Sequence, residues 1–149
     1  MTHARSLREA DAQVRLMISV EMIGTFDDAH GSQTFPVATK TLIYPDTGNF
    51  IAVVGRDAGL VAQVAGGMKA ASGVPVETLS APAGVPGTDL SDHRSFWAVG
   101  YPAVMVTDTA FYRNPRYHTS RDRPERLDYR RMAEVVEGIA CAVQAVAGR

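Results

Sequence analysis

Two residues of the sequence have side chains that could do chemistry where apolar segments end, the carboxylate of Glu21 and the imidazole of His118. Glu21 continues the apolar run LMISV, and His118 follows the run PAVMVTD within a stretch of tyrosines, prolines and charges. A lone carboxylate in a buried strand is unfavourable unless it is paired, protonated or bound to a metal. A plain reading is also open, in which Glu21 pairs with Arg15 or a backbone amide and His118 is an exposed loop histidine.

Three more polar residues lie near the ends of apolar segments. Asp92 and His93 belong to the triplet SDH, whose ordinary role would be to cap a helix, and Asp108 could cap the turn into TAFY. If these residues converge with Glu21 and His118, carboxylate and imidazole groups together favour a divalent metal, most naturally zinc.

The elements that would position these residues alternate along the chain. Four apolar runs predict strands, at residues 14–24, 49–55, 74–82 and 102–108. Helices are predicted at residues 2–13, 58–73, 91–100 and 129–148, with Thr2, Asp57, Ser91 or Asp92, and Asp128 as N-caps. Unbroken apolar strands that alternate with helices indicate an α/β sheet covered on both faces, with ligand sites just beyond strand ends.

Composition narrows the classes of partner. At 149 residues and a net charge of −1, the chain fits one domain, residues 1–149, and no basic run suggests nucleic acid. No apolar run reaches membrane-spanning length, and MTHARSL has no signal-peptide pattern, so we expect a cytoplasmic protein without a membrane partner. The single cysteine, Cys141, is expected to be a small core side chain.

Five blocks in order resemble the C-terminal half of the M28 family of zinc aminopeptidases: VEMIG, GVPV, SDHRSFW, GYPAVMVTDTAFYRNPRYHT and RPERLDYRRMAEVV. The resemblance implies an α/β fold, half of a mixed-sheet zinc-exopeptidase fold with about four strands and helices on both faces. It implies that Glu21 binds one zinc and His118 a second. The residues that it places around the substrate or behind the ligands are Asp92, His93, Asp108, Tyr112, Arg113, Asn114 and Tyr117.

The sequence departs from the family's pattern before Glu21. The family's other histidine, its bridging aspartate and its general-base glutamate precede this strand, and MTHARSLREADAQVRLMISV contains no such set. A catalytic zinc generally needs three protein ligands, and the resemblance supplies one for each ion. We therefore expect no catalytic base in this chain, poor metal binding and no hydrolysis by the chain alone.

The resemblance also implies a strand order and a partner. The family order 1-2-4-3-8-5-7-6 would make the four strands contiguous as 8-5-7-6, with Pro102–Asp108 at an edge. Because exposed apolar edges pair readily, we expect a second copy, or a chain that supplies the N-terminal half, to pair there.

Three functions remain open at this stage. The first is the C-terminal portion of a zinc-dependent aminopeptidase, which removes the N-terminal residue of a peptide. The second is a non-catalytic assembly or ligand-binding domain that keeps the peptidase fold. The third is acyl transfer of the glutaminyl-cyclase type, against which the full block TDTAFYRNPRYHT favours a peptidase.

Overall fold

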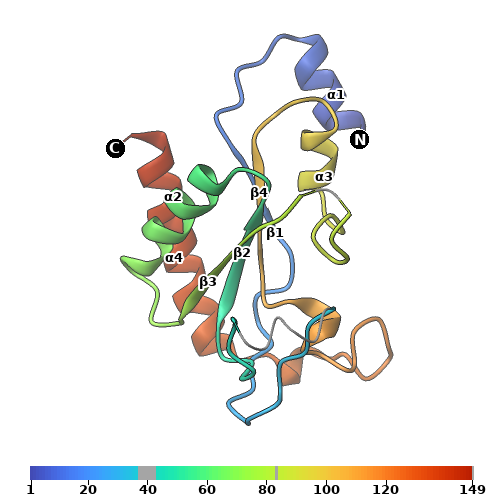
Figure 1. The fold of residues 1–149 in the computed structure, drawn as a ribbon, viewed down its shortest axis with the longest axis vertical. Helices are drawn as coiled ribbons and strands as arrows, with labels where there is room; N and C mark the ends of the chain where they lie inside the picture. Colours follow the sequence, from blue (N-terminus) through green and yellow to red (C-terminus); the bar gives the residue numbers. More distant parts are fainter. Residues whose placement is uncertain (37–42, 83, 149) are drawn as a thin grey trace.

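The computed structural model describes residues 1–36, 43–82 and 84–148, in which helices and strands alternate around one sheet (Figure 1). No helix in these residues is long and apolar enough to cross a membrane. The elements are α1 (Thr2–Glu9), β1 (Met17–Val20), β2 (Ile51–Gly55), α2 (Ala58–Lys69), β3 (Val76–Ser80), α3 (His93–Trp97), β4 (Ala103–Thr107), the 3₁₀ turns η2 (Ala110–Tyr112) and η3 (Pro124–Arg126), and α4 (Tyr129–Ala147).

The four strands form a mixed sheet in the order β1-β4-β2-β3. β1 runs parallel to β4 and β2 runs parallel to β3, whereas β4 and β2 are antiparallel. The carboxyl ends of β1 and β4 therefore lie at the same end of the sheet as the amino ends of β2 and β3. The predicted fold class, a mixed α/β sheet with helices on both faces, is confirmed.

The predicted strand order is wrong. Residues 103–107 form the interior strand β4, which is hydrogen-bonded to β1 on one side and to β2 on the other. Pro102–Asp108 is therefore not an open edge where another chain could pair. The physical reason is burial, because all five residues of β4 are buried and such a strand needs a neighbour on each side.

The edge strands of the sheet are instead β1 and β3, and β1 is the one that leads to Glu21. The N–H groups of Met17 and Glu21 donate to carbonyls of residues 102 and 106, beside and within β4. Because donors alternate between the two sides of a strand, the N–H groups of Ile18 and Val20 point away from β4. Val20 is 49% exposed, which is unusual for a valine in a sheet.

Helices α2 and α4 cover one face of the sheet (Figure 1). The predicted N-caps of these two helices are confirmed, since Asp57 accepts from Leu60 N and Asp128 accepts from Arg131 N. Gly67 of α2 lies against Ala142 of α4 so closely that a Cβ on residue 67 would stand 2.6 Å from the Ala142 Cα. The two helix backbones therefore meet with almost no side chain between them.

The other face of the sheet is covered only in part. Helices α1 and α3 pack there around Ala4, Phe96, Tyr101 and Ala103. A separate group of buried side chains on the strands lies beyond them, namely Phe50, Ala52, Val54 and Met105. This second group forms the floor of the site described below.

The predicted N-cap of α1 needs correction. Thr2 lies inside α1, whose capping position is Met1 and whose start has no side-chain cap. Val136 and Val143 share the helical spacing of the core residues of α4, yet they are 53% and 50% exposed.

Candidate active site

Glu21 lies directly after β1, and its carboxylate is held by a chain of hydroxyl groups. Ser91 Oγ donates to Glu21 Oε2 over 3.0 Å and lies 2.6 Å from the Ser19 hydroxyl. A serine hydroxyl has one proton, so Ser91 can serve Glu21 only if Ser19 donates to Ser91. Oε2 of the carboxylate thus accepts a hydrogen bond, whereas no described residue donates one to Oε1.

An apolar cavity of about 120 Å³ opens beside Glu21 on the face opposite α2 and α4. Its floor is formed by Phe50, Ala52 and Val54 of the β2 region and Met105 of β4. Further walls come from four segments: Gln33, Phe35, Pro36 and Tyr44; Glu77, Thr78 and Leu79; Val85, Pro86, Gly87, Thr88 and Leu90; and Thr107, Thr109, Ala110, Phe111, Tyr112 and Tyr117.

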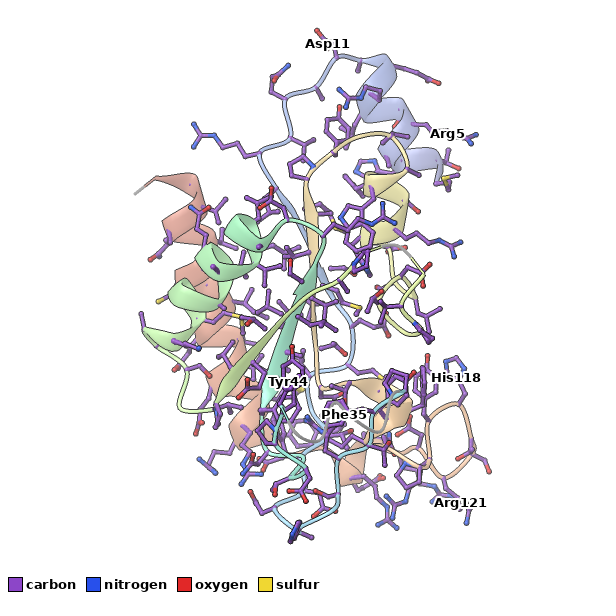
Figure 2. The ribbon with its side chains drawn as sticks, in the orientation of Figure 1. Arg5, Asp11, Phe35, Tyr44, His118 and Arg121 are labelled. Carbon is purple, nitrogen blue, oxygen red and sulfur yellow. The ribbon has the colours of Figure 1, made fainter. Side chains whose placement is uncertain are left out.

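Aromatic rings form much of the wall. Phe111 lies 4.4 Å from Tyr112 and 5.7 Å from Tyr117, measured between ring centroids. Phe35 and Tyr44 face each other across 5.8 Å, near the lower end of the sheet in Figure 2. Burial raises the pKa of Tyr112, so its phenol is neutral at ordinary pH.

His118 lies outside this lining. Its backbone has φ of 58°, its side chain is exposed, and its ring stacks on Tyr117 at 3.9 Å (Figure 2). Tyr117 therefore lies between His118 and the cavity, with Glu21 on the cavity wall.

Asp108 ties together the loops that follow β1 and β4. Its fully buried carboxylate accepts from the backbone N–H of Gly24, Thr25 and Ala110 at 3.2, 2.8 and 3.0 Å. Burial raises the pKa of Asp108, while these amides and the charge of Arg113 oppose the rise. Asp108 thus fixes the backbone that carries the candidate ligands rather than lining the cavity.

Arg113 is also buried. Its guanidinium donates to Gln33 Oε1 and to the carbonyl oxygens of Thr25 and Phe50. Burial lowers the pKa of Arg113 to about 10. Arg113 thus holds three separate segments in place. Its neighbour Asn114 donates to Asp122 and so fixes the loop between them.

The three residues of the SDH triplet, Ser91 to His93, make different contacts near the site. His93 is fully buried, with Nε2 2.8 Å from the carbonyl of Thr88, a residue of the cavity wall, and with its ring edge-on to Trp97. Burial lowers the pKa of His93. Asp92 stands at the N-cap of α3 but makes no capping hydrogen bond, and Ser91 is the member of the triplet that contacts Glu21.

The residues present do not amount to a metal site by themselves. Within residues 1–36, 43–82 and 84–148, no group of three or more His, Cys, Asp or Glu side chains is arranged to hold a metal ion. Glu21 offers one free oxygen, and the His118 ring is stacked on Tyr117. These two groups fall short of the three protein ligands of a catalytic zinc.

Sequence reasoning placed Glu21, Tyr112 and Tyr117 at the site, and it missed the cavity floor. The floor could have been found from strand geometry, because every second residue of a strand faces the same side, as Phe50, Ala52 and Val54 do. It also missed Ser19 and Ser91, since their contact joins positions 72 residues apart.

Comparison with known proteins shows the family and the fold that this chain shares. The model of Peptidase family M28 matches residues 3–143. The uncharacterized protein YfbL of Escherichia coli (strain K12) is 46% identical over 139 residues, which cover 92% of this chain and 42% of YfbL. Two solved structures share the fold: LapA aminopeptidase of Legionella pneumophila (TM-score 0.69, 22% identity) and the aminopeptidase of Aneurinibacillus sp. strain AM-1 (TM-score 0.61, 21% identity).

The chain is shorter than all three of these proteins. The two structural alignments include 99% and 97% of this chain, but only 35% of LapA and 29% of the Aneurinibacillus enzyme. The match thus concerns a peptidase-like domain within longer proteins. On the extent of the family match, this chain belongs to peptidase family M28.

Proposed function

We propose that this chain is the C-terminal portion of an aminopeptidase, and that it binds the apolar side chain of a peptide's N-terminal residue. Members of the M28 family are generally zinc-dependent. In this proposal Glu21 is a ligand of one zinc ion and His118 of a second, and the remaining ligands and the general base come from another polypeptide segment.

The observation that carries the proposal is the position of the apolar cavity. It opens beside Glu21, and its wall ends at Tyr117, the neighbour of His118. A cavity of about 120 Å³ has room for an aliphatic or aromatic side chain, and its lining offers few polar groups to a charged one.

The partner in this proposal attaches at β1. The N–H groups of Ile18 and Val20 point to the open side, so an added strand would continue the sheet next to Glu21. This places the missing ligands and base within reach of the cavity. Either a second chain or a further segment of the same polypeptide could supply that strand.

Mixing this chain with a polypeptide that carries the N-terminal half of an M28 peptidase tests the proposal. We expect the mixture to hydrolyse leucyl-anilide, whereas either chain alone is inactive. Ala52→Leu fills the cavity floor, so its kcat/KM should fall about tenfold for leucyl-anilide and much less for alanyl-anilide. Equal losses on both substrates would refute the assignment of the cavity.

Zinc binding tests the ligand roles separately from activity. Calorimetry on chelator-stripped chain alone should show weak binding, and adding the N-terminal half should produce tight binding that His118→Ala or Glu21→Gln weakens. The matched control is His3→Ala, since His3 is an exposed histidine of α1. Tight binding by the isolated chain that His118→Ala leaves unchanged would contradict these roles.

A non-catalytic binding domain is the second candidate. It is favoured by the lack of a three-ligand cluster within the described residues. A mixture that binds leucyl peptides without hydrolysing them, in the presence of zinc, would support this candidate over the first.

A further inference from the structure

A second concave site lies on the other side of Arg113 from the apolar cavity. Its volume is about 660 Å³, and no residue lines both sites. Its lining residues are Thr25, Phe26, Asp27, Arg113, Pro115, Arg116, Arg123, Glu125 and Arg126. Four arginines against two acids leave this site with a local excess of positive charge.

Arg113 forms an immobile, charged part of this wall. It is 6% exposed, and its guanidinium lies 4.6 Å from the Phe50 ring centroid and 5.8 Å from that of Phe26. All of its hydrogen-bond acceptors are neutral oxygens, and its Nη2 is buried with no partner in the described part of the chain. The nearest balancing charge, Asp108, is already engaged by three backbone amides.

The other three arginines leave their charge unpaired. Among the described residues, Arg116, Arg123 and Arg126 form no salt bridge. Arg116 precedes His118, whereas Arg123 and Arg126 lie in the segment that leads from His118 to α4, with Arg126 at the end of η3. Like charges gathered around one hollow repel each other, and an anion in the hollow would relieve that repulsion.

We propose that this hollow, bounded by residues 25–27 and 113–126, is a binding site for an oxyanion, either phosphate or carboxylate. Guanidinium groups suit both, because their planar fork donates two parallel hydrogen bonds to a pair of oxygens. The solvent-accessible arginines Arg116, Arg123 and Arg126 would make these bonds, and buried Arg113 would add its charge from behind. Gln33, which accepts from Arg113 Nε and also lines the apolar cavity, joins the two sites.

An NMR titration of the chain with inorganic phosphate at constant ionic strength tests the proposal, with acetate as the second arm. We expect saturable shifts at the backbone amides of Thr25, Asp27 and Arg126, with half-saturation on the order of millimolar. The double variant Arg123→Gln/Arg126→Gln should weaken binding about tenfold or more. Both residues are exposed, so the variant should still fold.

The charge-matched control is Arg5→Gln, because Arg5 lies on α1 at the opposite end of the molecule from Arg121 and this loop (Figure 2). Binding of either anion that only the double variant weakens supports the site, and the tighter of the two anions identifies the source of the oxyanion. Shifts that do not saturate, or that Arg5→Gln reduces as much, would overturn the proposal. None of these readouts depends on peptidase activity.

Discussion

The Glu21 carboxylate is oriented by residues that no sequence pattern links to it. Ser91 lies 70 residues after Glu21 in the sequence, and Ser19 lies in β1, two residues before Glu21. The direction of the hydroxyl chain, from Ser19 through Ser91 to Glu21, keeps a donor on Oε2 and so fixes the orientation of the carboxylate.

Ser91→Ala should therefore lower the free energy of unfolding by about 1 kcal/mol, because it removes two hydrogen bonds and leaves Ser19 without its partner. Urea denaturation measures the change. Ser95→Ala is the control, since the Ser95 hydroxyl, in α3, makes no hydrogen bond to the described residues, and its effect should stay within about 0.5 kcal/mol. Equal losses in both variants would refute the role of Ser91.

His93 makes stability depend on pH. Burial lowers its folded pKa below the ordinary value of 6.5, so the unfolded chain takes up a proton before the folded one does. The stability contribution of neutral His93 is thus present above pH 6.5 and is lost as the pH falls toward its folded pKa.

We expect the free energy of unfolding to fall between pH 7 and pH 5, by at most about 1.4 kcal/mol per pH unit from this one group. In His93→Gln this part of the slope should disappear, whereas His3→Gln should retain it. Urea denaturation across the pH range measures the slopes. An unchanged slope in His93→Gln would show that another group is responsible.

The sequence sufficed for several single residues and failed for their contacts. The family resemblance named Glu21, Tyr112 and Tyr117 as site residues, and all three lie on the cavity wall. The buried contacts of Arg113 join it to residues 63 to 88 positions away, and no local pattern encodes such a distance.

At the scale of elements, the packing of α2 against α4 depends on glycines at the contact, Gly67 most closely of all. Gly66 and Gly67 are adjacent in α2, yet a Cβ on Gly66 would meet nothing within 4 Å, whereas one on Gly67 would press on the backbone of Ala142. From sequence both glycines simply weaken the helix. The structure gives them opposite roles.

Gly67→Ala should destabilise the protein by about 2 kcal/mol, because α2 must move away from α4. Gly66→Ala should stabilise it by about 0.5–1 kcal/mol, since the helix gains a better residue in open space. Thermal unfolding followed by circular dichroism compares the two. Melting temperatures that shift in the same direction would contradict this account of the helix pair.

Element types were predictable where local chemistry decides them. Asp57 and Asp128 cap their helices as expected, and each apolar run contains a strand. Strand order was not predictable, because periodicity reports which face a residue occupies and says nothing of which strand lies beside it. The true order agrees with burial in the structure, where β4 is fully buried and β1 is partly exposed.

At the scale of the whole molecule, we expect the edge strand β1 to be the site of association. The chain spans less than half the length of YfbL and of both aminopeptidase structures. Val20, at the end of this edge, exposes about as much of its surface as Val136 on the outer side of α4.

We expect the isolated chain to self-associate through β1 at high concentration, and Val20→Lys to suppress this association, because a charged edge resists strand pairing. Val136→Lys introduces the same charge at a site of matched exposure and should leave association unchanged. Sedimentation velocity over a concentration series measures both. A chain that stays monomeric throughout, or a loss of association only in Val136→Lys, would exclude β1 as the contact.

β2 serves as a wall between two compartments. Ile51 and Val53 face the helices, whereas Phe50, Ala52 and Val54 face the cavity. The pairing of Val53 with Val106 and of Val54 with Met105 keeps the two sets apart. If β2 slipped by one position, the two sets would change sides, with phenylalanine against the helices and isoleucine in the cavity. The register of β2 against β4 thus keeps the core under the helices separate from the cavity that can hold a ligand.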